Sequence, residues 1–301
     1  MSQIVAASPH VTTKNSTAVI MRDVLIALLP AVIAGCVVFG LRALLVVTVT
    51  TAACVFFEWG FEKLCHTPST ISDLSAAVTG VLLAMNLPVS IPLWQAVFGA
   101  LVAIVAVKGL FGGIGKNFAN PAITARIVMF LAFSKSMTAW VFPDAVSSAT
   151  PLAMMANGES VDYLTLLLGN HGGCLGETSA LALLIGFAYL LIRGVISWHT
   201  PVCFVGTVFV MSLILGQDAV GQILSGGLML GAIFMATDYS TTPSTNLGRV
   251  LFGIGAGLLT VLIRFYGAYA EGVSFAILFM NILTPYLSKW TETKPFGGVA
   301  A

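Results

Sequence analysis

Ten runs of apolar residues follow one another along this chain of 301 residues. Each run is long enough, or nearly long enough, to cross the roughly 30 Å of hydrocarbon in a bilayer as a helix. Because 58% of the residues are hydrophobic and only 8% are charged, an ordinary soluble domain is excluded. The sequence therefore predicts an all-α polytopic membrane protein with about ten transmembrane helices. The runs lie at 23–40, 42–61, 73–87, 92–110, 120–134, 178–196, 202–216, 220–237, 248–265 and 272–288.

The long hydrophilic segment 135–177 divides the runs into two sets of five, 23–134 and 178–288. An odd number of helices in each half gives the halves opposite orientations, so we expect two inverted five-helix halves. Several runs, notably the third, fifth and eighth, are short or broken by Gly and Pro, which predicts broken or half helices beside protein or a polar cavity. Residues 1–22 and 289–301 are expected to be terminal tails.

Lysine and arginine indicate the orientation in the membrane, because cytoplasmic segments carry an excess of both. With the N-terminus in the cytoplasm, nine of them lie in cytoplasmic segments and three on the opposite side. We therefore expect a multi-pass protein of the cytoplasmic (inner) membrane, with both termini in the cytoplasm and the 135–177 loop outside. One helix fewer before residue 135 would reverse the side of the loop. The nine are Lys14, Arg22, Lys63, Lys108, Lys116, Arg193, Arg249, Lys289 and Lys294, and the three are Arg42, Lys135 and Arg264.

A glycine-rich segment that contains Gly112 and Gly113 joins the fourth and fifth runs. Asn120 is a good helix N-cap and Pro121 a good first helical residue, so the free amides of that helix could face an anion or an electron-rich ring. The alternative is a re-entrant turn that serves packing alone. A nucleotide-binding P-loop is disfavoured, because Lys116 does not fit the spacing GxxxxGK[ST].

Ionisable residues at membrane depth are candidates for function. Arg126 lies about a turn and a half into an apolar run, and it needs an anionic partner such as a phosphate, a carboxylate or a lipid headgroup. Asp73 and Asp238 stand at the ends of the third and eighth runs, where a carboxylate could equally face water or cap a helix. The scattered histidines and cysteines show no metal-ligand spacing. We expect no metal, no catalytic residue in this chain and no nucleic-acid partner.

A small, polar, turn-prone segment, Asp144 to Thr150, stands before Pro151 in the predicted outer loop. These residues favour an extended or turn conformation, so the Thr150 hydroxyl should be reachable by another enzyme or by a cofactor. No histidine lies nearby in the sequence to serve as the base that would activate it as a nucleophile. Thr150 is therefore interpreted as an attachment point and not as a catalyst.

The order of these segments resembles the NqrB/RnfD membrane subunits of the sodium-pumping quinone reductase and of the Rnf ion-translocating electron-transport complex. Three segments carry the resemblance: the glycine loop through Asn120-Pro121-Ala122, the 144–150 segment, and Ala236-Thr237-Asp238. The second is similar to the family's flavinylation motif Asp-x-x-Ser/Thr-Gly-Ala-Thr, with Ser148 where glycine is usual, which leaves the efficiency of flavinylation open. The short segment before the first run favours the RnfD type over the NqrB type.

This resemblance implies that Thr150 carries FMN through a phosphoester made by a separate flavin transferase. It also implies electron exchange with other Rnf-type subunits, including a flavinylated RnfG-type protein and integral membrane subunits, during ferredoxin/NAD electron transfer coupled to Na⁺ or H⁺ movement. The chain is then one component of a translocase and is not active alone. A second, noncovalent flavin (riboflavin or FMN) is implied in the helical core, with Gly112, Gly113, Asn120 and Arg126 as candidate contacts.

Two other functions fit the same apolar pattern. Ten spans in odd-numbered halves with broken helices are typical of a secondary transporter or channel with no redox cofactor. A membrane scaffold for a redox complex, with Thr150 unmodified, is the third possibility. Colour separates them, because only the flavoprotein is yellow.

Overall fold

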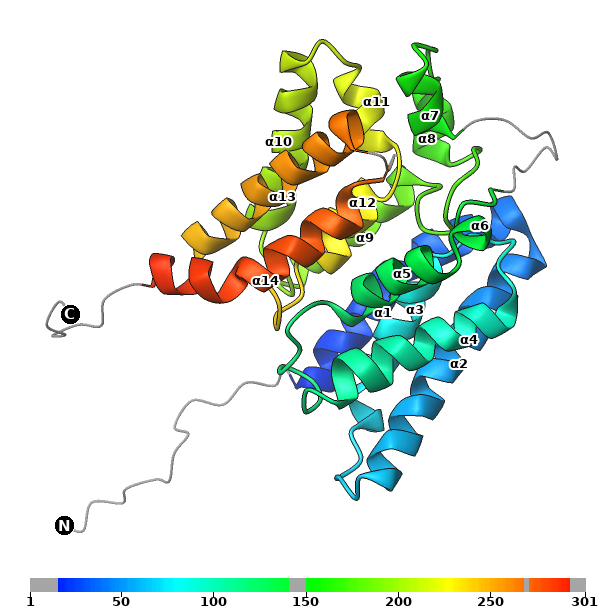
Figure 1. Ribbon diagram of the computed structural model, residues 1–301, viewed down its shortest axis with the longest axis vertical. Helices are drawn as coiled ribbons and strands as arrows, with labels where there is room; N and C mark the ends of the chain where they lie inside the picture. Colours follow the sequence, from blue (N-terminus) through cyan, green and yellow to red (C-terminus); the bar gives the residue numbers. More distant parts are fainter. Residues whose placement is uncertain (1–15, 141–149, 268–270, 293–301) are drawn as a thin grey trace, which may run out of the picture.

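The structure is a computed structural model that describes residues 16–140, 150–267 and 271–292. Within these ranges the chain is helical, with turns and short connections between the helices (Figure 1). The first half contains α1 Thr17–Phe39, α2 Leu41–Leu64, η1 Ile71–Asp73, α3 Ser75–Met85, α4 Leu93–Leu101, the π-helical η2 Val102–Gly109 and α5 Pro121–Ala132. The connection contains α6 Ser134–Met137, α7 Pro151–Ala156 and α8 Tyr163–Leu168. The second half contains α9 Ala180–Ile192, α10 His199–Ile214, α11 Ala219–Leu224, α12 Leu228–Leu230, the π-helical η3 Gly231–Met235, α13 Asn246–Tyr266 and α14 Val273–Thr291.

Every predicted apolar run contains a helix. The eighth run is broken, as expected, into α11, α12 and η3, whereas the third and fifth runs form the short, unbroken helices α3 and α5. The first helix begins at Thr17, before its apolar run, because the Ser16 hydroxyl caps it by accepting from the Val19 amide. The predicted outer loop is not wholly irregular, since α6, α7 and α8 lie in it.

Three of the described helices, α1, α2 and α13, are long and apolar enough to cross a membrane. Five other described apolar helices have only 10–17 residues. The all-helical, membrane-protein class is confirmed, and the number of ten crossings stays a prediction. The shorter ones are Ser75–Met85, Leu93–Gly109, Pro121–Ala132, Ala180–Ile192 and His199–Ile214.

The helices of the two halves form two groups that lie side by side in Figure 1, α1 to α5 in blue to green and α10 to α14 in yellow to red. In the first group α2 contacts α3 and α4, and in the second α10 contacts α11 and α13. The helix α9 packs against α1, and α14 packs against α5, which joins the groups. One continuous cluster of buried apolar residues runs through both groups.

Glycines allow close helix contacts both within a group and between groups. A Cβ atom on Gly80 of α3 would lie 2.6 Å from the Thr51 Cα atom of α2, and one on Gly186 of α9 would lie 2.3 Å from the Ala27 carbonyl oxygen of α1. Small residues at such crossings are how helices pack tightly without a hydrophobic driving force between them.

Candidate functional site

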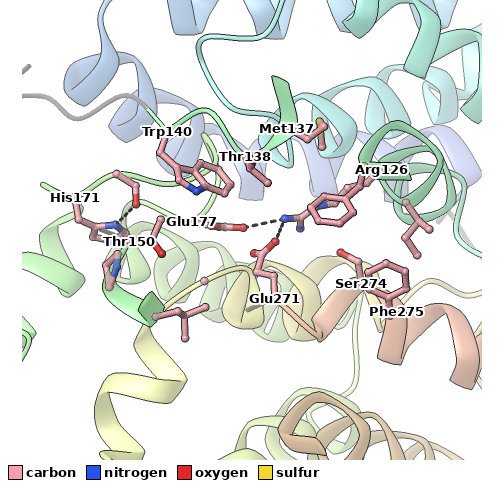
Figure 2. A pocket seen from close by; sticks show the side chains of 16 residues that line it. Arg126, Met137, Thr138, Trp140, Thr150, His171, Glu177, Glu271, Ser274 and Phe275 are labelled. Carbon is pink, nitrogen blue, oxygen red and sulfur yellow. Dashed lines mark hydrogen bonds and ion pairs between the residues drawn. The ribbon is translucent and has the colours of Figure 1, made fainter. Parts of the chain in front are cut away.

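A cavity of about 220 Å³ lies where α5, α7 and α14 approach one another (Figure 2). Part of its wall is apolar and aromatic, with Phe130, Met137, Trp140 and Phe275. The rest is polar and strongly charged. The polar wall residues include Arg126, Thr138, Thr150, His171, Glu177 and Glu271.

Thr150 stands at the N-terminus of α7 and faces this cavity. Pro151 fixes the first helical residue, and the Thr150 Oγ atom accepts a long hydrogen bond of 3.4 Å from the Ala153 amide. The side chain is half-buried, so its hydroxyl is both positioned by the cap and open to the cavity. The remaining residues of the predicted attachment segment, Asp144 to Ala149, lie outside the described residues.

Arg126 lies one and a half turns into α5, and its guanidinium is buried. Its Nη1 atom donates to the Asn86 Oδ1 atom at 2.7 Å. Its Nη2 atom contacts two carboxylates, Glu177 at 3.2 Å and Glu271 at the short distance of a direct ion pair, as Figure 2 shows. Of the three anionic partners that the sequence left open for Arg126, the structure shows carboxylates.

Both carboxylates are oriented by backbone amides from neighbouring turns. Glu271 accepts a 2.9 Å hydrogen bond from the Gly227 amide, and Glu177 accepts a 3.4 Å one from the Cys174 amide. Sequence reasoning missed this pair as a site. A signal existed, because each residue directly precedes an apolar run, much as Asp73 begins the third run.

Two further ionisable side chains belong to this region. Arg264, near the end of α13, donates to the carbonyl oxygens of Gln222 at 2.7 Å and Ser225 at 3.1 Å. His171 lies in the cavity wall, with its Nδ1 atom 3.2 Å from the Gly172 carbonyl oxygen. Burial lowers the pKa of the His171 imidazole, so the ring is neutral at ordinary pH.

A second, smaller cavity of about 90 Å³ lies at the opposite end of α5. Polar residues from the glycine loop, Asn117 and Asn120, share its wall with Thr237 and Asp238, which follow η3. Two of the three segments that carry the family resemblance therefore meet at one cavity. Lys108 also lines it, paired with the buried Glu58.

The four residues predicted to contact a second flavin do not lie together in the structure. Asn120 caps α5 as predicted: its side-chain oxygen accepts hydrogen bonds from the amides of Ala122 at 3.0 Å and Ile123 at 3.3 Å. These amides were expected to face a ligand, and here they bond to the Asn120 side chain. Asn120 lines the second cavity and Arg126 the first. Gly112 and Gly113 line neither. They form a turn with φ of +101° and +90°, a conformation that glycine adopts without strain.

The two predicted acids differ in their surroundings. Asp238 lines the second cavity and accepts hydrogen bonds from the hydroxyls of Ser240 at 3.1 Å and Thr241 at 3.2 Å. Asp73 is not among the lining residues, and it accepts from the Ser75 amide at 2.7 Å at the start of α3. Among the described residues no group of histidine, cysteine and acidic side chains could hold a metal ion.

Known proteins resemble the chain over nearly its whole length. The family model described as NQR2, RnfD, RnfE matches residues 4–297. The chain is 46% identical to the D-subunit of the Na(+)-translocating ferredoxin:NAD(+) oxidoreductase complex of Acetobacterium woodii, over 97% of this chain and 95% of that protein. It is 38% identical to the D-subunit of the proton-translocating ferredoxin:NAD(+) oxidoreductase complex of Clostridium ljungdahlii, over 97% and 96%. The D-subunit of the ion-translocating oxidoreductase complex of Halorhodospira halophila is 34% identical, over 99% and 96%.

Proposed function

This chain belongs to the NQR2, RnfD, RnfE family, and from that premise we propose that it is the RnfD-type component of an ion-translocating ferredoxin:NAD⁺ oxidoreductase complex. It acts as a membrane subunit of this translocase and not alone, since no dinucleotide fingerprint is present in its sequence. Two of its relatives are named for different ions, Na⁺ and the proton. Their names therefore support ion translocation by the complex and leave either ion as its cargo.

Within that complex, Thr150 carries FMN as a phosphoester that a separate flavin transferase makes. The observation that carries this proposal is the position of the Thr150 hydroxyl, which is open to a cavity with aromatic and cationic walls. The cavity is smaller than the roughly 300–1,000 Å³ of closed ligand sites. An attached flavin therefore inserts only in part, and the rest of it stays accessible to partner subunits.

The flavin supplies one- and two-electron redox chemistry, and the protein positions it. Phe130, Phe275 and Trp140 present ring faces and edges that suit contact with a flat aromatic ring. The Thr150 Oγ atom accepts one 3.4 Å hydrogen bond from the Ala153 amide, and formation of the ester replaces only its O–H hydrogen. The electron partners are other subunits, including a flavinylated RnfG-type protein and integral membrane subunits.

A second, noncovalent flavin, riboflavin or FMN, belongs in our proposal to the cavity at the other end of α5, where the volume of about 90 Å³ admits only an edge of the ring. Support comes from Asn117, Asn120 and Thr237, whose amide and hydroxyl groups suit the oxygen and nitrogen atoms of such a ring. Gly112 and Gly113 shape the loop that brings Asn117 there. Arg126 is reassigned to the Thr150 cavity, because it lines that one.

The proposal includes the topology: ten crossings in two inverted halves. Both termini lie in the cytoplasm of a bacterial cell and the Thr150 segment lies outside. Membrane lipid contacts the protein around its helices. The charge asymmetry of the connections supports this topology.

The test is covalent flavin on the Thr150→Val variant, produced together with the flavin transferase. Intact mass and in-gel fluorescence should show one flavin on the unsubstituted chain and none on the variant. Thr138→Val is the matched control, because Thr138 lines the same cavity and should leave flavinylation unchanged. Undiminished flavin in Thr150→Val, or a colourless unsubstituted protein as for a transporter without cofactor, would contradict the proposal.

A further inference from the structure

An open groove of about 720 Å³ lies between α2, η1 and α3, apart from both cavities described above. The helix α2 stands at the edge of the first group of helices, away from the second group (Figure 1). The groove lining is almost wholly apolar, with Ile71 of η1 and Val81 of α3 opposite α2. Of its two threonines, Thr48 donates its hydroxyl to the Leu45 carbonyl oxygen at 3.1 Å, within α2 itself. The groove therefore suits an apolar occupant.

The length of the groove matches one leaflet of a bilayer. On α2 the lining residues run from Val47 to Trp59, about 18 Å along the helix axis at about 1.5 Å per residue. The hydrocarbon of one leaflet is about 15 Å thick, half of the roughly 30 Å core. A transmembrane helix of a partner protein crosses both leaflets, whereas the acyl chain of a lipid ends within one. The groove therefore fits an acyl chain better than a helix.

One end of the groove carries the side chains that are typical of a membrane surface. Trp59 is 46% exposed there, and the Lys63 Nζ atom lies 5.1 Å from the centroid of the indole ring. Tryptophan is enriched where the hydrocarbon meets the headgroups, and a lysine near a helix end extends its ammonium group toward them. The apolar groove thus leads to a cation at the level of the lipid headgroups.

The charge of Lys63 is available to an anion. Within residues 16–140, 150–267 and 271–292 it forms no ion pair. The neighbouring carboxylates of α2 have other partners: Glu58 pairs with the buried Lys108, and Glu62 accepts from the Thr70 amide at 2.8 Å. A lysine without a carboxylate partner, next to an apolar groove, complements a lipid with a negative headgroup.

We propose that this groove binds one anionic phospholipid. Its acyl chain lies along α2 between Val47 and Trp59, and its phosphate contacts Lys63. The lipid belongs to the leaflet on the Lys63 side, which is the cytoplasmic leaflet in the proposed topology. Van der Waals packing against the groove and the charge of Lys63 favour this lipid over the surrounding ones.

The test is photolabelling of the purified complex in phosphatidylcholine vesicles that contain a small fraction of phosphatidylglycerol with a diazirine in its acyl chain. Peptide mass mapping should place many more adducts on residues 47–59 than on α9, whose apolar side chains are exposed outside the groove. Unlabelled phosphatidylglycerol should compete for residues 47–59 better than phosphatidylcholine. This measurement needs no substitution, so it remains decisive if a variant fails to fold.

Two variants test the two parts of the site. Ala52→Phe fills the groove from α2 and should reduce the adducts on residues 47–59 to the level of α9, because Ala52 is exposed in the groove lining. Ala188→Phe, at an exposed position of α9, is its matched control. Lys63→Gln should lower the preference for phosphatidylglycerol about fivefold, the effect of one lysine near an anionic surface. Lys289→Gln is the control for charge, because Lys289 is exposed at the end of α14 and is expected on the same side of the membrane.

Equal labelling of residues 47–59 and α9 would overturn the proposal, as would equal competition by the two lipids or unchanged labelling in Ala52→Phe. A benzophenone side chain introduced at position 52 identifies what covers the groove. Capture of another subunit there, instead of lipid, would show a protein interface and would also overturn the proposal. Intact mass of the same samples reports the flavin on Thr150, so failure of the proposed function is detected separately.

Discussion

Arg126 is a buried cation in the wall of the Thr150 cavity. Its guanidinium is buried with four partners, Asn86, Cys174, Glu177 and Glu271, drawn from three separate parts of the chain. Removal of one member of a buried ion pair leaves an uncompensated charge, whereas replacement of all members by neutral groups does not. The effects of substitutions at Arg126, Glu177 and Glu271 on stability should therefore not be additive.

The substitution Arg126→Met is expected to lower the free energy of unfolding by about 3–5 kcal/mol, because two carboxylates then remain buried without a cation. Thermal unfolding in detergent, followed by tryptophan fluorescence, measures the effect. Lys135→Met also replaces a cationic side chain with methionine, but at an exposed site, and should leave the melting temperature nearly unaltered. Adding Glu177→Gln and Glu271→Gln to Arg126→Met should recover part of the loss. Equal melting temperatures for the two single variants would contradict this account.

At the scale of helices, the contact of α2 with α3 depends on a residue without a side chain. Gly80 brings the α3 backbone against Thr51 of α2, and a Cβ atom there would overlap the backbone at 2.6 Å. Gly60, in α2, has open space around its own Cβ position. The two glycines look alike in the sequence, and only packing distinguishes them.

Gly80→Ala should therefore destabilise the protein by about 1–3 kcal/mol through overpacking. Gly60→Ala should be neutral, or stabilising by up to about 1 kcal/mol, since alanine is the better helix former. The difference between their apparent melting temperatures in one detergent is the measurement. The steric explanation fails if Gly60→Ala is the more harmful of the two.

For the whole molecule, the two cavities lie at opposite ends of α5, between helices of both halves. The proposed orientation puts the Thr150 cavity toward the outside and the Asn120 cavity toward the cytoplasm. Cys65, which is exposed just after α2, and Glu159, exposed after α7, should then lie on opposite sides of the membrane.

A membrane-impermeant maleimide should label Glu159→Cys in intact cells and Cys65 only after permeabilisation. Peptide mass mapping separates the two sites within one protein, so each serves as the control for the other. Labelling of Cys65 alone in intact cells would reverse the topology, and labelling of both would show that the number of crossings between them is even.

The sequence by itself determined the helical class, the positions of ten apolar runs that each contain a helix, and the Asn120 cap, because run length and capping are local properties. The assignment of Thr150 as the attachment point stays a prediction. The sequence also identified Arg126 as a buried charge in need of an anion. Only the tertiary structure decided which anions those are. Glu177 and Glu271 lie 51 and 145 residues along the chain from Arg126. The same holds for the separation of Asn120 from Arg126 into two cavities: both lie on one helix, and what each faces depends on how the other half packs against it, which no local pattern records.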